Sequence, residues 1–140
     1  MATVNLYIET NITGIGKKKG KCIYLLECET SKGPATIHEI FSVEATKDVA
    51  EIQAIIAAAK RINRQRCDIL NIYVTSEMLR TNIMHYLPNW AKRNYLKADG
   101  HRLSCWNYWK EIYENICIYD LRVYNKRHSY SNWLIKELQQ

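Results

Sequence analysis

The spacing of apolar residues predicts an alternation of strands and helices along the chain. Apolar and polar residues alternate over Val4–Glu9, which predicts a strand, and Cys22–Cys28 and Ala35–Val43 predict two more. The second and third segments are separated only by a turn at Ser31–Pro34. Strands joined by such short connections pair in antiparallel fashion, so we expect the first three strands to form a meander.

Helical spacing begins after the third strand. Between Thr46 and Asn63 apolar residues recur every three or four positions, which predicts a helix with Thr46 or Asp48 as its N-cap. The short apolar run Ile69–Val74 then predicts a strand that is buried on both faces and reached by a parallel crossover. The elements predicted beyond it are a helix at Ser76–Leu87 that ends at Pro88, a short basic helix at Asn89–Tyr95, a helix at Ser104–Asn115, a strand at Ile116–Tyr124 and a closing helix at Ser131–Gln140.

The composition is that of one globular domain covering residues 1–140. Hydrophobic residues make up 47% and charged residues 24%, which excludes a disordered chain, and no repeat or linker divides the sequence. The five cysteines are odd in number and form no C-x-x-C pair, so neither a disulfide framework nor a zinc knuckle is expected. We expect no signal peptide, because residues 1–10 already have a strand pattern, and no apolar run approaches about 18 residues. We therefore expect a cytoplasmic protein with no membrane partner.

Positive charge gathers in two places. The formal net charge of +6 favours an acidic partner such as nucleic acid. The candidate binding residues are Lys17, Lys18 and Lys19 in a glycine-containing turn, and Trp90, Lys92, Arg93, Tyr95 and Lys97 in a later stretch where basic and aromatic residues interleave. Each cluster has a second interpretation, because the lysines could form a solvated turn and the aromatic residues could pack on the core.

Three motifs resemble the bacterial type 1 ribonuclease H family. Trp90–Tyr95, followed by Leu96–Gly100, resembles the basic handle with which these enzymes hold an RNA–DNA hybrid. Cys105–Trp109 resembles the family's Asn-x-Asp-Leu-Trp stretch with its polar positions changed, and His128–Asn132 resembles a shortened form of the loop before the last helix. The resemblance spans nearly the whole chain. It implies an α/β, ribonuclease H-like fold, with a mixed five-stranded sheet, the first three strands antiparallel, and helices on both faces.

The same resemblance implies a degenerate metal site. The family cleaves RNA with four carboxylates that hold two divalent cations. The corresponding positions of this chain are Glu9, Glu51, Thr75 and Lys136, so two acids are kept and two are replaced. Thr75 offers a neutral hydroxyl, and Lys136 brings an ammonium that could replace the charge of a metal beside the two glutamates. We therefore predict a catalytically inactive pseudo-site with no bound metal and no cofactor.

The sequence also departs from the family where the RNA strand is recognised. An Asn pair precedes the helical glutamate in the family and senses the 2′-OH, whereas Lys47 and Asp48 occupy these positions here. Lys47 could bind a phosphate without distinguishing the sugar, which weakens the case for hybrid specificity.

Three hypotheses for function follow. The first is an inactive ribonuclease H-like domain that binds duplex or RNA–DNA hybrid nucleic acid, as an accessory protein of a phage or mobile element. The second is an endonuclease dependent on Mg²⁺ or Mn²⁺, in which Glu77 or Glu137 compensates for the lost acids beside Glu9 and Glu51. The third is a protein-interaction module that docks a protein partner through its Trp- and Tyr-rich surface. Converging carboxylates would favour the second hypothesis, and an apolar patch without a positive rim would favour the third.

Overall fold

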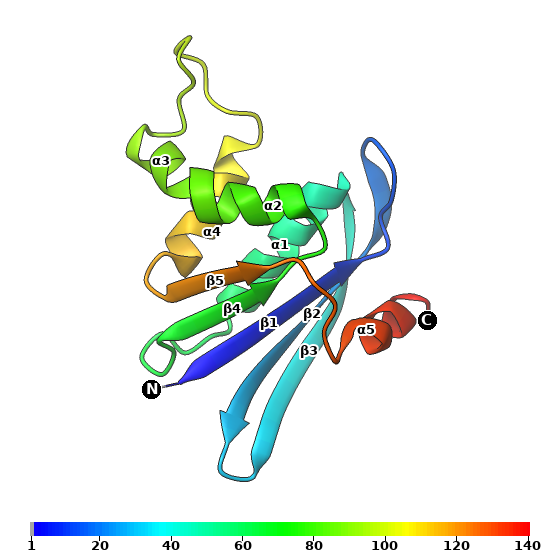
Figure 1. Cartoon of the computed structure of the whole chain (residues 1–140). Coiled ribbons are helices and arrows are strands. Elements are labelled where there is room, and N and C mark those ends of the chain that lie inside the picture. The colour runs from blue at the N-terminus through cyan, green and yellow to red at the C-terminus, as the bar shows by residue number, and fades with distance from the viewer. Residues whose placement is uncertain (1) are drawn as a thin grey trace.

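A mixed five-stranded sheet lies at the centre of the computed structural model, which describes residues 2–140 (Figure 1). The strands are β1 (Thr3–Thr10), β2 (Lys18–Thr30), β3 (Gly33–Ala45), β4 (Ile69–Tyr73) and β5 (Asp120–Tyr124), in the spatial order β3-β2-β1-β4-β5. The first three strands pair in antiparallel fashion, and β4 and β5 join β1 in parallel. The predicted sheet and its meander are confirmed.

Helices cover both faces of this sheet, as predicted. They are α1 (Lys47–Ala59), α2 (Glu77–Thr81), the π-helical turn η1 (Asn82–Tyr86), α3 (Leu87–Lys92), α4 (Trp106–Ile116) and α5 (Ser131–Leu138). Alternation along β1 sends Leu6 and Ile8 into the core beneath α1 and α4, while Tyr7 faces α5. The α5 side holds a smaller core in which Leu134 and Leu138 pack on Tyr7 and on β2. No helix in the part of the chain that the structure describes could span a membrane.

The helical segment that was expected to end at Pro88 continues through it. Proline cannot donate an i→i−4 bond, and its ring clashes with the carbonyl of residue i−4 in a regular helix. The chain avoids this clash by widening one turn just before the proline, where the Leu87 N–H donates to the carbonyl of Asn82, five residues back. Pro88 then occupies the first turn of α3, where no N–H is needed.

Two other strand predictions differ from the structure. The last strand begins at Asp120 instead of Ile116, because α4 extends to Ile116 and buries that side chain. In β4 only Leu70 and Ile72 are fully buried, and Ile69, Asn71 and Tyr73, which alternate with them, are half-buried. β4 is therefore buried on one face and not on both.

Candidate functional site

The structure brings Glu51 and Thr75 into direct contact. Glu51 lies in the second turn of α1, and Thr75 follows the end of β4, the strand next to β1. The Glu51 side chain is fully buried, and its Oε1 accepts hydrogen bonds from the Thr75 N–H at 2.8 Å and from the Thr75 hydroxyl at 2.9 Å. Two hydrogen bonds to one oxygen fix the orientation of the buried carboxylate.

An ammonium completes this cluster, and it comes from Lys47. Thr46 caps α1 by accepting a hydrogen bond from the Val49 N–H, which places Lys47 in the first turn, four residues before Glu51 and on the same helix face. The Lys47 Nζ donates to the Thr75 Oγ1 at 2.9 Å and lies 3.7 Å from the Glu51 Oε2. We name Glu9, Lys47, Glu51 and Thr75 the β1–α1 cluster.

The two glutamates of the β1–α1 cluster are destabilised as anions by burial. Burial raises the pKa of Glu51, while the Thr75 hydrogen bonds and the charge of Lys47 oppose the rise. Burial also raises the pKa of Glu9, opposed by a hydrogen bond from the Thr10 N–H. The charge of Glu51 raises the pKa of Glu9 further, whereas Lys47 and Arg127 lower it. Lys47 therefore stabilises both carboxylates.

Replacing Glu51 by glutamine is expected to stabilise the fold at neutral pH. Because the folded-state pKa of Glu51 is raised, its contribution to stability is full below the unfolded pKa and is lost as pH rises through the folded pKa. Removing the charge removes this loss, and we expect a rise of about 2–4 °C in Tm, the size of a typical single-substitution effect. Thermal unfolding of wild type and Glu51→Gln at several pH values between 4 and 7 should show the gap in Tm opening as pH rises. The exposed Glu29→Gln variant should leave Tm nearly unchanged, whereas a lower Tm for Glu51→Gln at pH 7 would mean that the Glu51 anion stabilises the fold.

The other predicted position of the metal site lies apart from the β1–α1 cluster. Lys136 is exposed in the last turn of α5, and no ion pair within residues 2–140 joins it to Glu9 or Glu51. The α5 residues that line the cleft of Glu9 and Thr75 are Ser131 and Ile135. The ammonium expected beside the carboxylates is thus present, but Lys47 and not Lys136 provides it.

The shifted acids of the nuclease hypothesis do not reach the cluster either. Glu77 is exposed in α2, where it pairs with Arg80 and accepts a hydrogen bond from Asn125. Glu137 is half-buried on α5, and it does not line the cleft that holds Glu9. These two acids therefore lie outside the Glu9 and Thr75 cleft.

The donor set of the β1–α1 cluster does not fit the two divalent cations of the family. Magnesium requires hard oxygen ligands in a near-octahedral arrangement. Here the Thr75 hydroxyl donates a hydrogen bond to Glu51 and accepts one from the Lys47 ammonium. Across residues 2–140, no three His, Cys, Asp or Glu side chains gather as a potential metal site. This arrangement of side chains therefore does not support a metal-dependent step.

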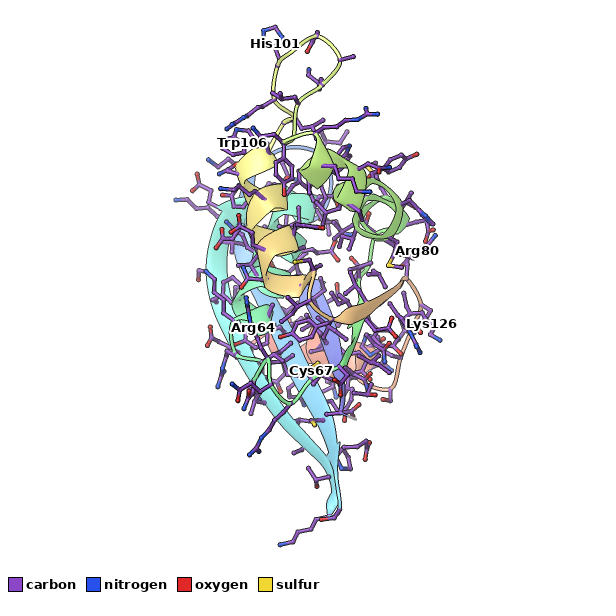
Figure 2. All side chains as sticks on the ribbon, turned by 90° about the vertical axis from the view of Figure 1, so that its left-hand side faces the viewer. Arg64, Cys67, Arg80, His101, Trp106 and Lys126 are labelled. Atoms are coloured by element: carbon purple, nitrogen blue, oxygen red, sulfur yellow. The ribbon has the colours of Figure 1, made fainter. Side chains whose placement is uncertain are left out.

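The basic stretch after α3 projects from the body as a handle. Residues 93–105 leave α3, turn back at Gly100 and return to α4, and an isolated bridge pairs Leu96 with Arg102 (Figure 1). The Lys97 N–H donates to the His101 carbonyl at 2.7 Å, which closes the tip. Figure 2 shows His101 at the far end of the handle and Trp106 near its base. Arg93 and Lys97 in this segment are exposed, and so is Lys92, the last residue of α3.

The aromatic residues anchor the handle to the body. Trp90 is half-buried, with its ring edge-on to Trp109 at 5.2 Å and stacked on Tyr86 at 5.9 Å. Tyr95 is only 4% exposed, so its ring holds the base of the handle and does not present a free stacking face. Arg102 lies 3.8 Å above the Trp106 ring, a cation–π contact that the sequence did not single out. Basic side chains, and not aromatic faces, are therefore what the handle presents.

The lysine-containing turn lies between β1 and β2, at the same end of the molecule as the handle (Figure 1). Its first residues turn at Gly14 and Gly16, and Lys18 already belongs to β2. All three lysines are exposed; Lys17 lies 3.9 Å from Glu44, and Lys18 donates to the Thr13 carbonyl at 2.7 Å. Lys19 follows Lys18 in β2.

A third basic segment borders the β1–α1 cluster and was not among the predicted binding residues. Asn125, Lys126, Arg127 and His128, which connect β5 to α5, line a cleft of about 320 Å³ together with Glu9 and Thr75. Burial and the charge of Arg127 lower the pKa of His128, whose ring packs against Tyr7 at 4.3 Å. The run of polar residues before the closing helix was the available signal. His128–Asn132 resembles the family's loop before the last helix, but this resemblance did not identify binding residues in the segment.

Comparisons with known proteins agree with this fold. The chain is 31% identical to a ribonuclease H of Rickettsia bellii over 80 residues. This aligned stretch covers 56% of this chain and 50% of the relative. A ribonuclease H of Rickettsia felis is 30% identical over 83 residues, covering 58% and 53% respectively. The chain thus spans about half the length of the curated relatives it matches. No protein-family model matches the chain.

Solved structures support the same fold at lower identity. LC9-RNase H1, a type 1 RNase H with the type 2 active-site motif, superposes with a TM-score of 0.75 at 15% identity, covering 96% of this chain and 69% of that one. LC11-RNase H1 in complex with RNA/DNA hybrid gives a TM-score of 0.62 at 15% identity, covering 96% and 92%. The chain therefore has a ribonuclease H-like fold, and its sequence is similar to ribonucleases H over about half of their length.

Proposed function

We propose that this chain is a nucleic-acid-binding domain that holds duplex or RNA–DNA hybrid without cleaving it. The observation that carries the proposal is the position of the Lys47 ammonium, 2.9 Å from the Thr75 hydroxyl and 3.7 Å from the buried Glu51 carboxylate. A monovalent side-chain cation there opposes the entry of a divalent cation, because like charges at close range repel strongly in a partly buried site.

Binding is supported by the placement of exposed positive charge. The handle and the lysine-containing turn project from the same end of the molecule, and the Lys126–Arg127 segment borders the cleft of Glu9 (Figure 1). Phosphate contacts from such side chains provide most of the affinity for nucleic acids and carry little sequence information. LC11-RNase H1 and a foamy viral protease-reverse transcriptase have been solved with RNA/DNA hybrid, and the chain is similar in fold to the first and to 19% of the second. We extend this ligand class to the present chain.

Selectivity for hybrid over duplex DNA is expected to be weak. Lys47 occupies a position at which the family senses the 2′-OH, and its ammonium is engaged by Thr75 and Glu51. Neither partner leaves Lys47 free to distinguish a ribose from a deoxyribose. We therefore expect the affinities for RNA–DNA hybrid and for double-stranded DNA of equal length to agree within about tenfold, a smaller gap than a dedicated set of 2′-OH contacts would give.

Fluorescence anisotropy at two salt concentrations tests the proposal. The probes are an 18-base-pair RNA–DNA hybrid and a DNA duplex of the same sequence, at 50 and 200 mM salt. With about four phosphate contacts, the affinity should fall by about two orders of magnitude between these conditions. Salt-sensitive binding of both probes supports the proposal. No binding at 50 mM salt would overturn it and favour the protein-interaction hypothesis.

A further inference from the structure

Three tyrosines form a continuous stack across the sheet face that α5 leaves partly open. Tyr7, Tyr73 and Tyr124 are partners in the register of β1, β4 and β5. Their ring centroids are 4.7 and 5.1 Å apart, and their planes are tilted by 23° and 28°. α5 packs on β1 and β2, so it covers the inner end of this row and not the end at β5 (Figure 1).

The inner end of the tyrosine stack is closed. His128 lies 4.3 Å from the Tyr7 ring and Tyr130 lies 5.1 Å from it. The Tyr7 hydroxyl donates to Glu27 at 3.3 Å, and Tyr130 donates to the same carboxylate. No further ring can be added on this side, because α5 and these side chains fill the space.

The outer end of the stack carries a cation in place of a ring. Tyr124 is half-buried on β5, an edge strand of the sheet, and Tyr73 stacks on one face of its ring. The Lys126 Nζ lies over the Tyr124 ring, 4.8 Å from its centroid. β5 is the last strand on this side of the sheet, so a planar group could extend the stack beyond the face of Tyr124 that Tyr73 does not cover.

Cations surround this open end. Arg122, two residues before Tyr124 and on the same face of β5, is exposed and pairs at 3.2 Å with the equally exposed Asp120. Lys126 and Arg127 follow Tyr124 and also line the cleft of Glu9 and Thr75. Figure 2 shows Lys126 at the surface on the same side as Arg80. An aromatic face bordered by basic side chains is the combination with which proteins bind single-stranded nucleic acid.

We propose that the outer face of Tyr124 stacks on the base of an unpaired nucleotide, while Lys126 moves from the ring to the adjacent phosphate. The base is uncharged, so its approach to Tyr124 is not opposed by the surrounding cations. Stacking of the base on Tyr124 replaces the cation–π contact of Lys126 with a larger contact area. The inference rests on the proposed function and refines it, because the preferred ligand becomes a duplex or hybrid with a single-stranded end. The Lys126–Arg127 segment gives this end a basic path from the cleft to Tyr124.

Binding of overhang-bearing probes tests this inference. The probes are a blunt 18-base-pair DNA duplex and the same duplex with a four-nucleotide 5′ or 3′ overhang that carries 2-aminopurine. At least one overhang should raise the affinity of the wild type about 5- to 10-fold and quench the 2-aminopurine fluorescence. Tyr124→Leu should remove both the gain and the quenching and leave binding of the blunt duplex unchanged. Tyr124→Phe keeps the ring and should retain both.

Further outcomes separate this inference from the proposed function. Lys126→Ala should keep the quenching and lower the salt dependence of overhang binding by about one phosphate contact. If no duplex binds, a 2-aminopurine pentanucleotide is titrated at 50 mM salt; quenching that Tyr124→Leu abolishes would support the stacking site although the proposed function fails. The inference is overturned if neither overhang raises affinity in the wild type, or if folded Tyr124→Leu, verified by its thermal unfolding, retains the gain.

Discussion

Simultaneous replacement of Lys92, Arg93 and Lys97 by alanine is expected to weaken binding of an RNA–DNA hybrid by about 100-fold at 100 mM salt. Each lost phosphate contact should lower the slope of log K against log salt by about 0.9, so three contacts lower it by about 2.7. The three side chains are exposed, and within residues 2–140 no ion pair involves Lys92 or Arg93. Lys97 lies 4.0 Å from Asp99, a pair too exposed to compete with a phosphate.

A second triple variant controls for the loss of net charge. Lys32, Arg64 and Arg66 are exposed in the β2–β3 turn and in the loop after α1, at the end of the molecule away from the handle (Figures 1 and 2). Their replacement by alanine removes the same charge and should weaken binding by less than about fivefold, through long-range attraction alone. Equal losses from the two triple variants would show that binding follows overall charge and not the handle.

Restoring an acid and removing the ammonium should convert the β1–α1 cluster into a metal site. In Lys47→Asn/Thr75→Asp, three carboxylates would face one another without Lys47, so the fold should be destabilised in EDTA. Mg²⁺ should then stabilise it, by about 2.7 kcal/mol when its concentration is about 100 times its Kd. This corresponds to about 5–10 °C in Tm for a chain of this size. The wild type should show no such response to Mg²⁺.

The single variant Thr75→Asp separates the two changes. It adds the carboxylate and keeps Lys47, whose ammonium lies 2.9 Å from the position of the present hydroxyl and would pair with the new acid. We expect its Tm to respond to Mg²⁺ much less than that of the double variant. Thermal scans of all three proteins in EDTA and in Mg²⁺ provide the comparison. A rise of several degrees in the wild type on adding Mg²⁺ would mean that Glu9 and Glu51 already hold a metal.

The strands and the antiparallel meander of the first three were predictable from local patterns in the sequence, whereas the mixed five-stranded sheet was implied by the family resemblance. Alternation of apolar and polar residues in β1 and helical spacing in α1 are the periodic signals of these two element types. The π-helical turn at Asn82–Tyr86 could not be predicted in this way. Ending the helix before Pro88 and widening the turn before it are both compatible with the same residues, and packing of Ile83 and Leu87 in the core selects the second.

The candidate site was predicted only in part, because motif resemblance does not show which side chains meet in space. Motif resemblance located Glu51 and Thr75, which the structure joins by two hydrogen bonds. It assigned the neighbouring ammonium to Lys136, although the i, i+4 spacing of Lys47 and Glu51 on a capped helix was a direct signal for that pair. The tyrosine stack was not visible in the sequence, because it depends on the register between three strands that are far apart in the chain.

Cleavage of a bound hybrid is the most direct test of catalytic inactivity. The wild type would be incubated with a 5′-labelled 18-base-pair RNA–DNA hybrid at 50 mM salt, with Mg²⁺ or Mn²⁺, at a protein concentration at which anisotropy shows the probe to be bound. We expect an intact RNA strand after hours with either ion. Cleavage that requires the metal and disappears in Glu51→Gln would contradict this expectation, and would make the β1–α1 cluster an active site.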